Sequence, residues 1–142
     1  MYKVLIANAS NKRETRLIAE SIAEGLRKSG IYINVLDIKD ITRLKEYDAI
    51  ILDSGIYVKD LLQKIKPDLS DTSEINFERK IGGAFGKPGG SDKSISNLCD
   101  VMKNVMKMDV VNIPLTLESI SSVSELRKAK EFGQKIAERL NA

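Results

Sequence analysis

The chain has 142 residues, of which 42% are hydrophobic and 30% charged, and its formal net charge is +3, an ordinary composition for one folded domain. It has no histidine and a single cysteine, Cys99, which excludes an internal disulfide framework and any site built on histidine. Basic residues are scattered and tryptophan is absent, so nucleic-acid binding has no support, and no apolar run approaches the roughly 18 residues of a membrane span.

Short apolar runs alternate along the chain with helical patterns. Five runs predict strands, because each is short and bounded by turn signals: Tyr2–Ala7, Tyr32–Asp37, Ala49–Leu52, Lys80–Phe85 and Val110–Pro114. Apolar residues at helical spacing predict long helices that begin near Thr15, Ile95 and Leu126. A short helix or turn is predicted over Ile38–Lys45, and a short helix over Asp60–Ile65.

This alternation predicts an α/β protein, a three-layer α/β/α sandwich around a parallel sheet. Because crossovers are right-handed, few topologies remain, and five strands favour the order 2-1-3-4-5 in a single domain over residues 1–142. Ligands of such sheets bind beyond the carboxyl ends of the strands, where the strand order reverses. Here that rim comprises three segments: Ser10–Thr15, Asp53–Lys59 and Gly86–Ser91.

The first of these segments joins a strand to a helix without any glycine. The N–H groups at a helix start lack intrahelical partners and attract anions, so this joint predicts a phosphate site. Ser10, Asn11 and Thr15 add side-chain donors, while Lys12 and Arg13 add positive charge. The alternative is an ordinary helix cap formed by Ser10 or Asn11.

Together the three segments resemble short-chain flavodoxins and the flavodoxin-like domain of flavodiiron proteins, nearly end to end. Ser10, Thr15, Ala19 and Ile22 match the family's phosphate-loop pattern. The stretch "YDAIILDSGIYV" is similar to the family's third strand and flavin-contacting loop, and "IGGAFGKPGG" resembles its fourth strand and loop. The main departure is Arg13, which sits where the family prefers Gly or Ala. We expect this arginine to strain the loop backbone and to turn either inward onto the phosphate or outward to solvent.

The resemblance implies that the chain binds FMN. Tyr57 matches the aromatic residue that stacks on the isoalloxazine ring, and Lys87 could place positive charge near the ring's pyrimidine edge. The alternatives are that Tyr57 packs on its own helix and that the third segment is a plain surface turn. No catalytic residue or metal site is expected, and Cys99 is expected in the core. The expected cofactor-binding residues are Ser10, Asn11, Lys12, Arg13, Glu14, Thr15, Ser54, Gly55, Ile56, Tyr57, Gly86, Lys87, Pro88 and Gly89.

The resemblance further implies an electron carrier that serves redox partner proteins through FMN, rather than a dedicated enzyme. Because the apolar run Val4–Ala7 is too short for a secretory signal, we expect a cytoplasmic protein, a monomer or a weak dimer. One alternative is a small flavin-dependent oxidoreductase, since "SGIY" before a lysine-rich helix also resembles quinone-dependent protoporphyrinogen oxidases. The other is an interaction module that has lost FMN, which Arg13 and the missing second aromatic favour.

Overall fold

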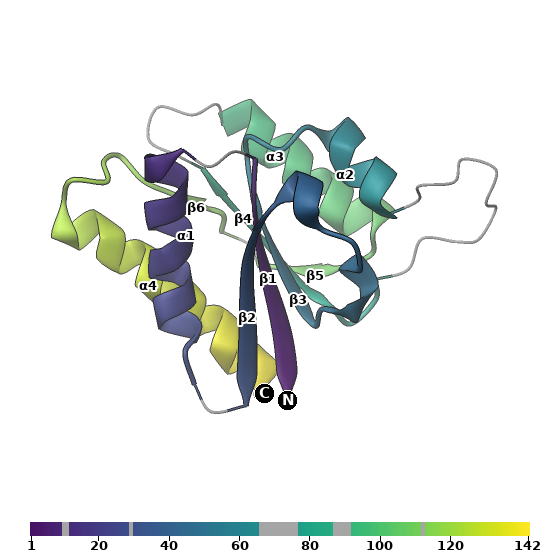
Figure 1. Cartoon of the computed structure of the whole chain (residues 1–142), viewed down its shortest axis with the longest axis horizontal. Helices are drawn as coiled ribbons and strands as arrows, with labels where there is room; N and C mark the ends of the chain where they lie inside the picture. The colour runs from purple at the N-terminus through teal and green to yellow at the C-terminus, as the bar shows by residue number, and fades with distance from the viewer. Residues whose placement is uncertain (10–11, 29, 66–76, 87–91, 112) are drawn as a thin grey trace.

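A parallel sheet with helices on both faces forms the frame of the chain (Figure 1). The computed structural model describes residues 1–9, 12–28, 30–65, 77–86, 92–111 and 113–142. Its strands are β1 (Tyr2–Asn8), β2 (Ile31–Asp37), β3 (Ala49–Asp53), β4 (Ile81–Gly86), β5 (Asp109–Val110) and β6 (Leu115–Thr116).

The strand order is β2-β1-β3-β4-β5, and every strand pair is parallel, which confirms the predicted topology. β1 lies at the centre of the reversal, because Val4 is paired with Ile33 of β2 and with Ala49 of β3.

The fifth strand differs from the prediction. Instead of one strand over Val110–Pro114, two short strands pair with β4: β5 pairs with its beginning and β6 with its end. Pro114 directly precedes β6 and cannot donate to a ladder, because proline has no N–H. Asn112 lies outside the described residues.

Two pairs of helices cover the sheet (Figure 1). α1 and α4 pack together on one face, and α2 and α3 lie on the other. Two single 3₁₀ turns lie in the region of Ile38–Lys45, where the sequence predicted a short helix or turn, and α3 continues into a π-helical turn. The bounds are α1 (Arg13–Leu26), η1 (Ile38–Asp40), η2 (Leu44–Glu46), α2 (Val58–Ile65), α3 (Asp92–Asp100), η3 (Val101–Val105) and α4 (Val123–Leu140).

The two central strands, β1 and β3, carry the core. Val4 and Ile6 contribute to the cluster under α1 and α4, whereas Leu5 and Ala7 contribute to the cluster under α2 and α3. All of β3 is buried. This double burial explains the unbroken apolar runs in the sequence, because a parallel strand covered on both faces has no polar side to present.

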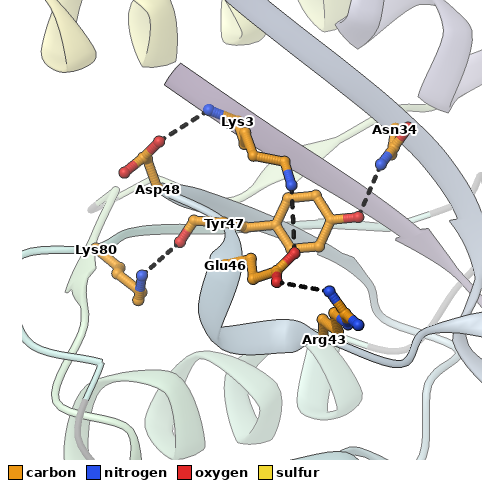
Figure 2. Close-up of polar contacts among 7 residues, drawn as sticks. All are labelled: Lys3, Asn34, Arg43, Glu46, Tyr47, Asp48 and Lys80. Carbon is orange, nitrogen blue, oxygen red and sulfur yellow. Dashed lines mark hydrogen bonds and ion pairs between the residues drawn. The ribbon is translucent and has the colours of Figure 1, made fainter. Parts of the chain in front are cut away.

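A polar network closes the amino end of the sheet (Figure 2). Asp48, which precedes β3, accepts a hydrogen bond from the N–H of Lys3 at 2.8 Å. The Lys80 ammonium donates to the carbonyl of Tyr47 at 2.7 Å, and Asn34 donates to the Tyr47 hydroxyl at 2.8 Å. These contacts connect β1, β2 and β3 with the residue that precedes β4, at the edge of the sheet opposite the predicted ligand rim.

Candidate functional site

The carboxyl rim brings together the ends of β1, β3 and β4. The Ser54 N–H donates to the carbonyl of Phe85 at 2.8 Å, which ties the segment after β3 to the end of β4. A side chain added at Gly55 would place its Cβ 3.1 Å from the Ala9 Cβ, which shows how closely the segment after β3 approaches the segment after β1. The described residues at the ends of β1, β3 and β4 therefore lie close together at the carboxyl edge of the sheet.

The start of α1 forms the first part of the site. Lys12 is the N-cap residue, and its side chain makes no capping hydrogen bond. Arg13 and Glu14 are exposed, whereas Thr15 is buried. Ser10 and Asn11 lie outside the described residues. Because a lysine side chain has no acceptor with which to cap, the first N–H groups of α1 receive no capping contact from the N-cap residue.

The expected backbone strain at Arg13 is wrong. Among the described residues, the non-glycine residues with positive φ are Arg79 and Lys107, so Arg13 has an ordinary backbone. Arg13 is the first residue of α1 and needs no glycine-like freedom. The conformation of Arg13 therefore does not require a glycine at this position.

Asn8 is a buried polar residue two positions before the phosphate loop, which we define as residues 10–15. Its side chain is 3% exposed, and within the described structure its Oδ1 has no hydrogen-bond partner. An unsatisfied buried acceptor costs about 1–3 kcal/mol. The sequence analysis did not identify Asn8, although a single amide side chain at the end of an apolar strand could have indicated a polar residue at the rim.

The segment Ser54–Tyr57, the ring loop, forms the second part of the site. Ser54 and Ile56 are buried and hold the loop, while Gly55 is exposed. Tyr57 is 77% exposed, so its ring has little packing against its own helix, contrary to the alternative interpretation. An exposed aromatic ring at a ligand rim has a free face for stacking.

The third segment is described only at its first residue. Gly86 is buried at the end of β4, and a Cβ added there would lie 3.4 Å from the Ser54 hydroxyl oxygen. Lys87, Pro88 and Gly89 lie outside the described residues. The role expected for Lys87 stays a prediction.

Asp53 is a second polar residue that sequence analysis left without a role. It ends β3, is 3% exposed and faces two loops at once. Its Oδ2 accepts the N–H of Ala9 at 3.0 Å, and its Oδ1 accepts the N–H of Gly55 at 3.0 Å. An aspartate at the end of an otherwise apolar strand was the signal that could have identified it.

Elsewhere, the described residues offer little other chemistry. They contain no group of three or more Cys, Asp or Glu side chains able to hold a metal ion. Burial raises the pKa of the half-buried Cys99 thiol, and nearby Asp100 adds to the effect. Met102, Met106 and Met108 are buried in the core beside α3, as expected from the sequence. In the described part of the chain, no helix has the length and apolar content that crossing a bilayer requires.

A groove of about 760 Å³ lies away from the three segments, between the β5–β6 edge and α4. Phe132 and Leu115 form part of its apolar lining, and Lys128, Lys135 and Arg139 lie along it together with Glu131 and Glu138. The mixed charges select no ligand class.

Comparison with known proteins finds similarity to a flavodoxin and to a rubredoxin-oxygen oxidoreductase. No family model matches it. A flavodoxin from Clostridium saccharobutylicum is 26% identical over 155 residues, covering 97% of this chain and 97% of its own length. The rubredoxin-oxygen oxidoreductase of Megalodesulfovibrio gigas is 25% identical across 99% of this chain, which spans 36% of the length of that relative.

Solved structures agree with the sequence relatives. The structure of a flavodoxin from the domain Archaea has a TM-score of 0.77 and 25% identity, and the match covers 99% of both chains. The resemblance inferred from the three rim segments is thereby confirmed, as is the flavodoxin-like fold.

Proposed function

We propose that this chain, which is similar to flavodoxins and to the flavodoxin-like domains of flavodiiron proteins, binds FMN and carries electrons between redox partner proteins. When bound, FMN supplies the redox chemistry through its isoalloxazine ring, and the protein binds, orients and tunes it. An electron carrier needs no general acid or base, which suits a chain without histidine.

The proposal rests on two features that follow the carboxyl ends of the neighbouring strands β1 and β3. The start of α1, which the Lys12 side chain does not cap, can receive the phosphate dianion through its backbone N–H groups. The exposed ring of Tyr57 can stack on the isoalloxazine. Ser10, Asn11 and Thr15 are proposed as further phosphate donors, and Gly86–Gly89 as the loop that approaches the pyrimidine edge.

The residues present fit FMN in their chemistry. The phosphate loop supplies hydrogen-bond donors and cations, and the ring loop supplies an aromatic face. The carboxylate in these two loops is that of Glu14, which is exposed. The buried Oδ1 of Asn8 still lacks a donor among the described residues. A ribityl hydroxyl or a phosphate-loop N–H that is reorganised on binding could supply one.

The proposal takes residues 1–142 as one cytoplasmic domain, a monomer or weak dimer. Because the chain spans only 36% of the rubredoxin-oxygen oxidoreductase, the proposal does not extend to the whole activity of that relative. A net charge of +3 favours redox partners with an acidic docking surface, since complementary charge accelerates encounter.

Titration of flavin-free protein with FMN and with riboflavin tests the proposal. FMN alone carries the phosphate, and each charge-assisted hydrogen bond contributes about 1.5–3 kcal/mol. FMN is therefore expected to bind at least tenfold more tightly than riboflavin, with a gap that narrows as salt is added. Equal affinities for FMN and riboflavin would exclude the proposed phosphate site. A colourless protein that FMN does not restore would favour the interaction module instead.

A further inference from the structure

Asp53 connects the two loops on which the proposed function rests. Its carboxylate accepts one hydrogen bond from Ala9, directly before the phosphate loop, and one from Gly55, inside the ring loop. Both bonds are 3.0 Å long, and the side chain is 3% exposed. The Asp53 carbonyl also accepts the N–H of Ile56 at 3.0 Å, so backbone and side chain hold the same loop.

Asp48, at the other end of the same strand, offers a natural comparison. Its Oδ2 accepts the N–H of Lys3 at 2.8 Å (Figure 2), so both ends of β3 are tied to β1 by a carboxylate. Asp48 is only half-buried and lies at the amino edge, away from the rim. Both aspartates therefore tie β3 to the β1 segment, but of the two it is Asp53 that also contacts the ring loop and the residue directly before the phosphate loop.

We propose that Asp53 is a positioning residue that fixes Ala9, the residue from which the phosphate loop starts, and the ring loop in one relative geometry before flavin binds. This inference rests on the proposed function, because it assumes that FMN spans both loops. A ligand that spans two loops gains both sets of contacts only when the loops are correctly spaced. A ligand that uses the ring loop alone is indifferent to that spacing.

The test compares Asp53→Asn with the matched control Asp48→Asn. An asparagine can still accept one N–H through its Oδ1, but its amide nitrogen cannot accept the other. In Asp53→Asn, we expect FMN affinity to fall about tenfold or more and riboflavin affinity to fall much less, so that the ratio of the two dissociation constants shrinks. In Asp48→Asn, that ratio is expected to stay at the wild-type value, because this carboxylate does not touch either loop.

A general loss of stability would not change the ratio, and this separates positioning from a purely structural role. An unchanged ratio in an Asp53→Asn protein that still binds FMN would overturn this inference while leaving the proposed function intact. A wild-type protein that binds neither flavin would instead overturn the proposed function and, with it, this inference.

A second measurement needs neither a mutation nor a flavin. If Asp53 holds the loops in advance, the Ala9 and Gly55 amides of flavin-free wild-type protein exchange slowly with deuterium, even though Gly55 is exposed. Slow exchange at both amides supports the inference, including the case in which Asp53→Asn fails to fold. Rapid exchange at both would overturn it, because the loops would then become ordered only when the ligand arrives.

Discussion

Gly25 of α1 lies directly against the carbonyl group of Lys130 in α4, so closely that a methyl group at Gly25 would overlap the Lys130 oxygen. Gly133 of α4 makes the reciprocal approach to the carbonyl of Ile22. The two helices meet backbone to backbone, and both glycines are buried. This close approach positions α1, whose amino end forms the phosphate loop.

The first prediction concerns this contact. In an exposed helix, Gly25→Ala would stabilise the protein by up to about 1 kcal/mol. Here the added methyl must push two backbones apart, and we expect the free energy of unfolding to fall by about 2 kcal/mol or more. Urea denaturation measures it. The control Glu20→Ala, on the exposed side of α1, should change stability by less than about 0.5 kcal/mol, and stabilisation by Gly25→Ala would contradict the close packing.

Tyr57 carries the second prediction. We expect Tyr57→Ala to weaken FMN binding by about 1–3 kcal/mol, the range for losing an aromatic stacking platform. Tyr57→Phe should retain most of the affinity, because the ring is preserved. Since the side chain is 77% exposed, neither change should lower the stability of flavin-free protein appreciably. Tyr32, half exposed on the edge strand β2, supplies the control: Tyr32→Ala should leave FMN affinity unchanged, and equal effects at both tyrosines would exclude stacking by Tyr57.

Arg13 is the subject of the third prediction. Its side chain is exposed and its backbone unstrained, so we expect Arg13→Ala to change FMN affinity by less than about 1 kcal/mol, as for a screened surface charge. Arg13→Gly should bind FMN no better than Arg13→Ala and should be less stable by up to about 1 kcal/mol, because glycine is a poor helix former. Calorimetric titration of both variants with FMN and riboflavin measures this. A loss of affinity for FMN but not for riboflavin would contradict this prediction and would show that the Arg13 guanidinium binds the phosphate.

The fourth prediction concerns Arg79 and Lys107, the described non-glycine residues with positive φ. Arg79, with φ of 72°, occupies the turn that the Lys80 N–H closes onto the Phe77 carbonyl at 3.0 Å. Lys107 has φ of 62°. We expect Arg79→Gly and Lys107→Gly each to stabilise the chain by up to about 1 kcal/mol, since glycine adopts positive φ without strain. Glu131→Gly, at an exposed position in the middle of α4, should destabilise it by a similar amount. Thermal unfolding distinguishes these signs.

Cys99 gives the fifth prediction, one of pH dependence. Because burial raises the pKa of its thiol, the folded chain retains the thiol proton at pH values where the unfolded chain loses it. This contribution to stability is complete below the unfolded-state pKa and is lost as pH rises through the folded-state pKa. Since the thiolate is the nucleophile, iodoacetamide should label native Cys99 more slowly at pH 8 than the same chain in urea. Equal rates would show an unperturbed thiol.

Much of the fold was determined by the sequence alone. The runs around Val4–Ala7 and Ala49–Leu52 lack a polar face, which in a parallel sheet means burial on both sides, and their alternation with amphipathic helices leaves few topologies. The rim that this topology defines follows directly, because the carboxyl ends of parallel strands lie at one edge. The likeness of the rim segments to flavodoxins came from local patterns of the same kind.

Tertiary structure decided what depends on contacts between distant segments. The exposure of Tyr57 and the unpartnered Oδ1 of Asn8 depend on what packs around them, and no local pattern encodes that. Asp53 accepts one hydrogen bond from Ala9, which follows β1 and lies 44 residues away in the sequence. It accepts the other from Gly55, in the loop after β3. The backbone conformation of Arg13 depends on where α1 begins. As the first residue of the helix, Arg13 takes a helical φ, whereas in a tight turn the same residue could need the positive φ that favours glycine.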